Sequence, residues 1–257
     1  MTPPRPLALL SNDDGYESKA LHALHRALVD AGADVVVVAP SNEQSATSHS
    51  LSLHRPLRAR SHGEGIHSLD GTPADCVYIA LHAGERFLPR RPDVVVSGIN
   101  RGLNLGQDAF YSGTVAAARE GALRGIPALA SSAHVHADLP KIAELSAFFA
   151  LALVGTRSST GKAPLLSLNA PEVWSGEVRV CRLGSRLYDE LVDIRVDPRG
   201  REYLWLGGPG VRHEPDPGSD TEAYDAGAVT LTPLVIDLSA PAETAFAERL
   251  AASLRAR

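Results

Sequence analysis

The sequence predicts an α/β fold in which helices cover both faces of a mostly parallel β-sheet. Short apolar runs typical of buried strands alternate with longer segments of helical periodicity over residues 7–168. The apolar runs are continuous rather than alternating, which is typical of strands buried on both faces. Strands that alternate with helices favour crossover connections between parallel strands, with helices on both sides of one sheet.

The first elements follow directly from this pattern. We expect a strand at residues 7–10 and then a helix whose apolar residues recur every three or four positions, ended by Gly32. A β-branched run at residues 35–39 predicts the second strand. The polar and small residues 41–50 that follow predict a loop.

The alternation continues with clear boundary signals. Thr72 is suited to cap a helix over residues 74–82, because Pro73 favours the first helical position. A buried strand at residues 94–97 and a helix at 115–123 come next. The series then runs through a strand at 128–131, a helix at 141–154 and a strand at 165–168.

The pattern changes after about residue 170. The expected elements are strands at 178–183, 192–196, 203–206 and 229–234, a Gly/Pro/Asp-rich loop at 207–222, and a helix at 241–254. We expect one domain over residues 1–257, with a core at about 1–170 and an extension at about 171–257 that projects an arm.

Composition limits the classes of function. The 257 residues carry a net charge of −5, which argues against binding to a nucleic-acid duplex because phosphate contacts need clustered basic residues. Cys76 and Cys181 form no zinc-binding pattern. No apolar run approaches the roughly 20 residues that span a membrane, or resembles a signal peptide. We therefore expect a cytoplasmic protein without a membrane partner.

Polar loops after three expected strands point to a metal site. They carry Asp13 and Asp14, then Ser45, then Asn100. Because parallel strands end at one edge of a sheet, these oxygen-bearing side chains are expected to meet there, as suits Mg²⁺, Mn²⁺ or Ca²⁺. The alternatives are an N-cap with a first-turn acid for the aspartates, and turn residues for Ser45 and Asn100.

A fourth segment predicts an anion site. Tyr111, Ser112, Gly113 and Thr114 precede the helix expected at residues 115–123. Free backbone N–H groups and the helix dipole favour a phosphate at such a position, and a metal beside a phosphate implies phosphoryl chemistry. Plain N-capping by Ser112 or Thr114 is the alternative, and it is compatible with phosphate binding.

Taken in order, these motifs closely resemble the SurE family (survival protein E) of metal-dependent nucleotidases. The resemblance covers almost the whole chain. It rests on Asn12-Asp13-Asp14-Gly15, Gln44-Ser45, His49-Ser50, Gly71-Thr72-Pro73-Ala74-Asp75, Ser97 to Asn104, Tyr111-Ser112-Gly113-Thr114-Val115 and Thr232-Pro233-Leu234. The departures are mild: Ala46 stands where the family commonly has glycine, and Leu51-Ser52 where it has Ile-Thr.

The resemblance implies a fold, an assembly and a site. It implies a Rossmann-like core, a projecting β-hairpin arm and a C-terminal helix swapped between subunits of a homodimer or homotetramer. It implies one divalent metal ion per subunit. The matched metal ligands are Asp13, Asp14, Ser45 and Asn100. The catalytic and phosphate-binding set is Asp13, Asp14, Asn104, Ser112, Gly113 and Thr114.

The predicted function is metal-dependent hydrolysis of nucleoside 5′-monophosphates, and of 3′-monophosphates as well, by a metal-activated water. An aspartyl-phosphate intermediate is the alternative mechanism. Two rival functions are a nucleotide-binding sensor without turnover and a metal-dependent glycosyltransferase. The roles of His49 and His213 stay open, because scattered histidines are more often structural or exposed than functional.

Overall fold

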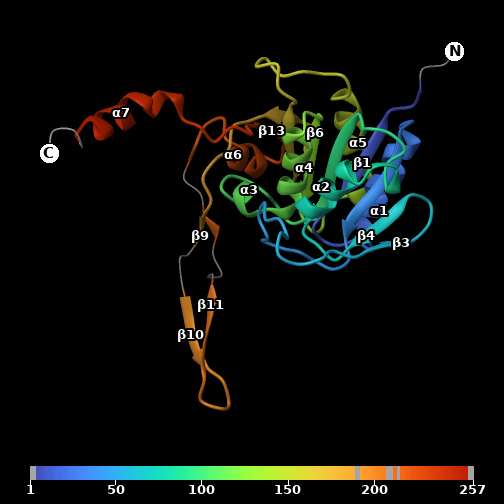
Figure 1. The fold of residues 1–257 in the computed structure, drawn as a ribbon. Coiled ribbons are helices and arrows are strands. Elements are labelled where there is room, and N and C mark those ends of the chain that lie inside the picture. Colours follow the sequence, from blue (N-terminus) through green and yellow to red (C-terminus); the bar gives the residue numbers. More distant parts are fainter. Residues whose placement is uncertain (1–3, 189–191, 207–210, 213–214, 254–257) are drawn as a thin grey trace.

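The computed structural model describes residues 4–188, 192–206, 211–212 and 215–253. Its main feature is a nine-stranded sheet (Figure 1). The strand order is β3 (Ala59–Ser61), β4 (Ile66–Leu69), β2 (Asp34–Pro40), β1 (Leu7–Ser11), β5 (Val94–Arg101), β6 (Ala128–Ala133), β7 (Leu165–Ala170), β13 (Val229–Leu234) and β8 (Val178–Val180). The predicted α/β fold with a mostly parallel sheet is confirmed. The six neighbouring strands β4, β2, β1, β5, β6 and β7 all pair in parallel.

Helices cover both faces of this sheet. Helices α1 (Lys19–Asp30) and α5 (Leu139–Ala152) pack on one face, and α2 (Pro73–His82) and α4 (Gly113–Leu123) on the other. Successive residues of β1 serve opposite cores, since Leu10 belongs to the first apolar cluster and Leu9 to the second. The continuous apolar runs of the sequence reflect this two-sided burial.

Several boundaries differ from the expected ones. Strands β3 and β4 were not predicted, because residues 59–69 are short and partly polar. Strand β5 extends to Arg101, past a register shift between Ser97 and Asn100, so Asn100 lies in the strand and not in the loop after it. Two short helices, η1 (Gly84–Arg86) and α3 (Asp108–Tyr111), are also additional.

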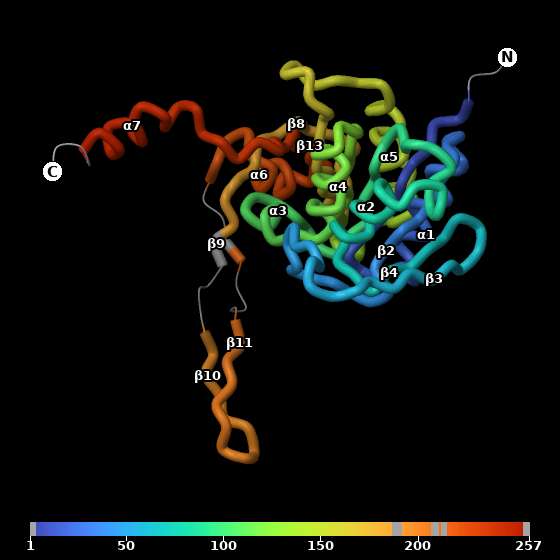
Figure 2. Tube along the Cα trace, viewed as in Figure 1, coloured from blue at the N-terminus to red at the C-terminus, as the bar shows by residue number. Residues whose placement is uncertain are grey.

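A long arm projects from the body of the protein (Figures 1 and 2). Strands β9 (Leu187–Tyr188) and β12 (Val211–Arg212) pair near its base, and β10 (Val192–Val196) and β11 (Glu202–Leu206) pair along its length. The prediction of a loop over all of residues 207–222 was wrong in part, because this segment contains β12 and the start of α6 (Asp220–Asp225).

The C-terminal segment lies away from the body (Figure 2). It consists of η2 (Pro241–Glu243) and α7 (Thr244–Ser253), whose described side chains are all exposed. The predicted helix is therefore present, although Leu254 at its expected end lies outside the described residues. Its exchange between subunits stays a prediction. Among the described residues, no helix has the length and apolar character needed to cross a membrane.

Candidate metal and phosphate site

The predicted site residues gather at the carboxyl ends of the central strands. Strands β2 and β5 lie on opposite sides of β1, so the chain switches direction across the sheet at this point. Open α/β sheets bind their ligands at such a switch. A cavity of about 600 Å³ opens here. Its lining includes Asp13, Asp14, Ser45, Asn100, Asn104 and Ser112.

Asp13 is held at the amino end of α4. Its side chain is only 5% exposed. The backbone N–H of Thr114 donates to Asp13 Oδ2 over 3.1 Å, and the Thr114 hydroxyl donates to Oδ1. Burial raises the pKa of Asp13, and the hydrogen bonds from Thr114 partly offset this rise by favouring the charged form. A nearby cation would complete the stabilisation of this buried charge.

Gly113 allows this close approach. A β-carbon at position 113 would lie 2.9 Å from Asp13 Cβ and 3.0 Å from Pro73 Cγ. A larger residue would push α4 away from the carboxylate. Thr114 is fully buried behind Asp13, whereas Ser112 lines the cavity. The phosphate-binding roles expected for Gly113 and Thr114 stay a prediction.

Asp14 supplies the second carboxylate. Burial, and then the charge of Asp13 beside it, raise the pKa of Asp14 to about 6. Its Oδ2 atom is buried and has no hydrogen-bond partner. An unpaired buried carboxylate oxygen is costly and calls for a cation or a proton. Asp14 therefore fits a metal ligand on an observation independent of the motif.

Ser45 and Asn100 are oriented so that an oxygen of each remains able to bind a cation. The Ser45 hydroxyl donates to Glu43 Oε1 over 2.7 Å, which leaves its lone pairs as acceptors. The Asn100 Nδ2 group donates to the Gly102 carbonyl over 3.0 Å, so the donor end of the amide is already used. Together with the aspartates, these side chains make an all-oxygen set that suits a hard divalent cation.

Asn104 and Ser112, two further predicted residues, are fixed by hydrogen bonds to neighbouring elements. Asn104 is 6% exposed, and its Nδ2 group donates to Ser132 Oγ over 2.8 Å. Its backbone N–H donates to Asn169 Oδ1 over 2.7 Å. Ser112 Oγ accepts from the Val115 N–H over 3.1 Å, so the N-capping interpretation is correct for its side chain. Both residues still line the cavity.

The loop that carries Ser45 is anchored to α4. His49 Nε2 lies 2.8 Å from Glu120 Oε2, and Glu120 is 2% exposed. Burial opposes ionisation of Glu120, but hydrogen bonds from His49 and Arg124 outweigh it and lower the pKa of Glu120. His49 therefore has a structural contact rather than a ligand position. His213 lies outside the described residues.

The same loop contains two residues in the left-handed backbone region. Ala46 has φ +56° and Ser48 has φ +52°, where glycine is favoured. Ser48 is fixed by bonds to α3: its N–H donates to the Tyr111 carbonyl over 3.0 Å and its hydroxyl to the Phe110 carbonyl over 2.7 Å. The tertiary contacts thus hold a conformation that the local sequence disfavours.

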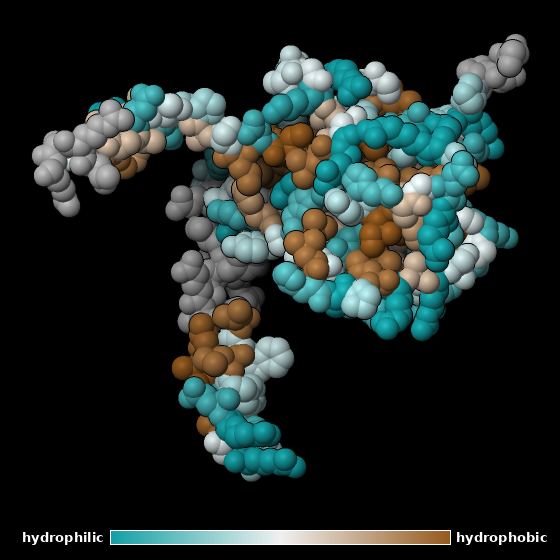
Figure 3. Space-filling model, viewed as in Figure 1, coloured by the Kyte–Doolittle hydropathy of each residue, from teal (hydrophilic) through white to brown (hydrophobic). Residues whose placement is uncertain are grey.

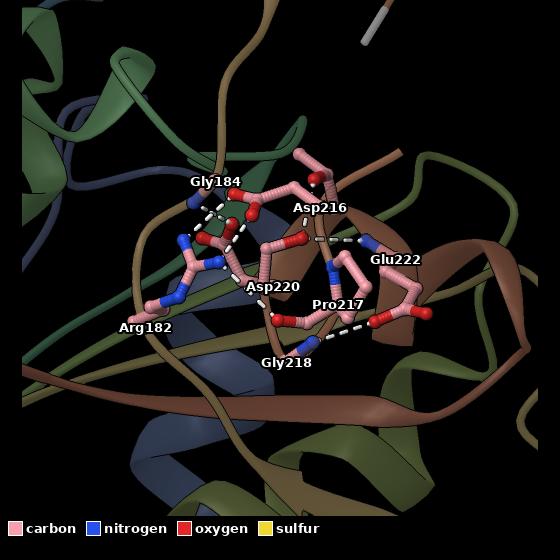
Figure 4. Close-up of polar contacts among 9 residues, drawn as sticks. Arg182, Gly184, Asp216, Pro217, Gly218, Asp220 and Glu222 are labelled. Atoms are coloured by element: carbon pink, nitrogen blue, oxygen red, sulfur yellow. Dashed lines mark hydrogen bonds and ion pairs between the residues drawn. The ribbon is translucent and has the colours of Figure 1, made fainter. Parts of the chain in front are cut away.

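The base of the arm is tied to the same region. Asp220 is fully buried, and it accepts from the Gly184 N–H over 2.7 Å and from the Gly106 N–H over 3.0 Å. Figure 4 shows Asp220 beside Gly184, next to the pair formed by Arg182 and Asp216. Gly106 lies just before α3, so this carboxylate connects the arm to the rim of the cavity.

Seven further residues line the cavity without belonging to the predicted metal-ligand or catalytic sets. They are Glu43, Ala46, Arg101, Leu103, Asp108, Tyr111 and Leu206. All except Leu206 lie within or near motifs that the sequence analysis singled out. Leu206 lies on the arm, and no local pattern in the sequence indicates that the arm reaches this site.

Within the described part of the chain, no group of three or more His, Cys, Asp or Glu residues could hold a metal ion. The candidate site instead combines two aspartates with a hydroxyl and an amide. Zinc sites are built mainly from Cys and His, so this composition favours oxygen-binding cations over zinc.

Comparisons with known proteins agree with this geometry. The family model for survival protein SurE matches residues 8–190. The chain is 60% identical over 252 residues to the 5′-nucleotidase SurE of Sorangium cellulosum, covering 97% of each chain. It is 44% identical to the 5′-nucleotidase SurE of Geotalea daltonii, over 90% of this chain and 93% of the relative.

A solved structure shows the same fold. The crystal structure of the SurE protein from Aquifex aeolicus matches with a TM-score of 0.81 and 35% identity. The match covers 95% of this chain and 99% of the Aquifex chain. With the family model and the near-complete curated relatives, this shows that the chain belongs to the survival protein SurE family.

Proposed function

We propose that this protein is a metal-dependent 5′-nucleotidase that hydrolyses nucleoside 5′-monophosphates, and 3′-monophosphates as well, to nucleoside and phosphate. The observation that carries the proposal is the buried, unpartnered Oδ2 of Asp14 beside the buried carboxylate of Asp13. The membership of this protein in the SurE family, whose relatives are nucleotidases, supports the same activity.

Each residue has a distinct part in this proposal. Asp13, Asp14, Ser45 and Asn100 would hold one divalent ion per subunit, Mg²⁺, Mn²⁺ or Ca²⁺. Such an ion supplies positive charge for the phosphate oxygens and lowers the pKa of a water. Asn104, Ser112 and Arg101 border the same cavity, where they would contact the phosphate. Gly113 and Thr114 fix Asp13 from behind, and their predicted contact with the phosphate would come from the same end of α4.

Direct attack by water is the mechanism we favour. Both Asp13 oxygens accept hydrogen bonds from Thr114, which holds this carboxylate in place and reduces its reactivity as a nucleophile. Asp14 is assigned to the cation. Direct attack is one displacement at phosphorus, so a substrate made chiral at phosphorus should give inverted product, whereas retention would instead support the two displacements of the aspartyl-phosphate mechanism.

The test of the function is phosphate release by the purified protein. With AMP and Mn²⁺ we expect phosphate and adenosine in equal amounts, and no release in excess EDTA. Asp13→Asn should lose the activity, whereas the exposed Glu144→Gln on α5 should keep it. Binding of AMP without phosphate release would instead indicate a nucleotide sensor. Transfer from a sugar nucleotide would indicate a glycosyltransferase.

We also propose that the protein forms a homodimer or homotetramer. Phe246 on α7 is 52% exposed and Leu250 is 57% exposed, four residues apart on one helical face. Figure 3 shows further apolar surface along the arm. A swapped C-terminal helix would cover the apolar face of α7 with a second copy of the chain. A cytoplasmic location stays a prediction, which cell fractionation would check.

A further inference from the structure

The cavity at the candidate site is lined by both polar and apolar side chains. The polar ones include the two aspartates. Leu103, Tyr111 and Leu206 line the same cavity and are apolar or aromatic. A cavity of about 600 Å³ is in the range that holds small organic ligands, about 300 to 1,000 Å³. It therefore has room for more of the substrate than its phosphate.

Tyr111 is an exposed aromatic residue in the lining of the cavity. It is 65% exposed, although its main chain is fixed by the hydrogen bond from Ser48. An aromatic ring on an immobilised backbone loses little conformational entropy when a flat ligand covers it. Tyr111 directly precedes Ser112, and both residues line the cavity.

The arm supplies another apolar side chain to the same cavity. Leu206 at the end of β11 is 87% exposed and lines the cavity. The base of the arm is fixed to α3, because Arg186 Nη1 lies 2.8 Å from Asp108 Oδ2 and both side chains are less than a fifth exposed. The Arg186 N–H also donates to Gln107 Oε1 over 2.6 Å. These contacts hold the base of the arm to the helix that ends in Tyr111.

We propose that the apolar part of the cavity lining forms a nucleobase subsite, in which the base of the substrate stacks on Tyr111 and contacts Leu206. This inference rests on the proposed nucleotidase function and adds a source of specificity to it. The subsite favours nucleotides over phosphate esters that lack a base. Because every base has an aromatic face, stacking on Tyr111 favours nucleotides without selecting one base strongly.

Two substrates separate this role from a general structural one. AMP and ribose 5-phosphate share the phosphate and the sugar, and only AMP carries a base. Tyr111→Ala should lower kcat/KM for AMP about tenfold, mainly through KM, as expected for the loss of one base–aromatic stack. The kcat/KM for ribose 5-phosphate should stay within about twofold of the wild-type value, since this substrate places no base on the ring.

The neighbouring residue provides a matched control. Phe110 is 54% exposed on the same helix and is not part of the cavity lining, so Phe110→Ala should leave both substrates unaffected. Tyr111→Phe should restore AMP hydrolysis, because it keeps the ring. An equal loss for both substrates with Tyr111→Ala, or no loss for AMP, would overturn the subsite. Failure of the wild-type protein to hydrolyse AMP would instead remove the proposed function.

The arm is tested in the same way. Leu206→Ala should lower kcat/KM for AMP selectively, by about threefold, as expected for losing part of one apolar contact. Leu204 lies on the same strand, is 57% exposed and does not line the cavity, so Leu204→Ala is the control. A loss with Leu206→Ala that is equal for AMP and ribose 5-phosphate, or no loss, would exclude the arm from the subsite.

Discussion

Replacing Asp14 with asparagine should stabilise the metal-free protein while removing its activity. The Asp14 carboxylate is destabilised by burial and by the adjacent Asp13, which together raise its pKa from 3.8 to about 6. One pKa unit corresponds to about 1.4 kcal/mol, so the charge costs at most about 3 kcal/mol of folding stability. Because the side chain is partly exposed, we expect about 1–3 kcal/mol.

The sign of this effect depends on pH. The folded protein binds the Asp14 proton more tightly than the unfolded chain does. The charged Asp14 carboxylate therefore destabilises the folded state fully above pH 6. It disappears as the pH falls from about 6 toward 4, because the folded-state carboxyl becomes neutral. The gain from Asp14→Asn should therefore be largest at pH 8 and should shrink at acidic pH.

Urea unfolding in EDTA, followed by circular dichroism, measures this gain. Glu144→Gln is the control, since it removes a charge at an exposed position on α5. Added Mn²⁺ should then stabilise the wild-type protein more than Asp14→Asn, because a ligand stabilises the state that binds it. The reasoning is refuted if Asp14→Asn is no more stable than wild type at pH 8, or if Mn²⁺ stabilises both equally.

Three further predictions concern the frame of the site and the assembly. Thr114→Val removes a hydrogen bond to Asp13, so calorimetry should show Mn²⁺ affinity reduced about tenfold or more; unchanged affinity would contradict this. His49→Ala should raise the Mn²⁺ concentration needed for half-maximal activity, and His49→Gln should largely restore it by pairing with Glu120; an equal effect of both variants would exclude this pairing. Truncation after Asp237 removes α7, so light scattering should show a smaller assembly; a full-length mass near 27.2 kDa would rule out an obligate dimer.

The central sheet could be predicted from the sequence because strands that are buried on both faces must consist of apolar residues. Residues in β1 and β2 face apolar clusters on both sides, which requires the continuous apolar runs on which the prediction rested. Strands β3 and β4 carry no such signal. Residue Arg60 of β3 is exposed, so the pairing of this edge strand depends on β4 and not on a local apolar pattern.

The positions of the predicted site residues were easier to infer from the sequence than their contacts. The loops after the strands indicated where Asp13, Asp14 and Ser45 would lie. That Thr114 faces Asp13 instead of the cavity depends on how closely α4 approaches β1, a distance that Gly113 sets and that no periodicity reveals. The contribution of Leu206 depends in the same way on the placement of a distant arm.

The site assignment leads to one expected position for the cation. Crystals of the protein soaked in Mn²⁺ can be measured for anomalous scattering at the manganese edge. The account predicts one strong peak per subunit, within about 2.0–2.6 Å of oxygen atoms of Asp13, Asp14, Ser45 and Asn100. A peak bound elsewhere in the cavity, or no peak at Mn²⁺ concentrations that support phosphate release, would contradict it.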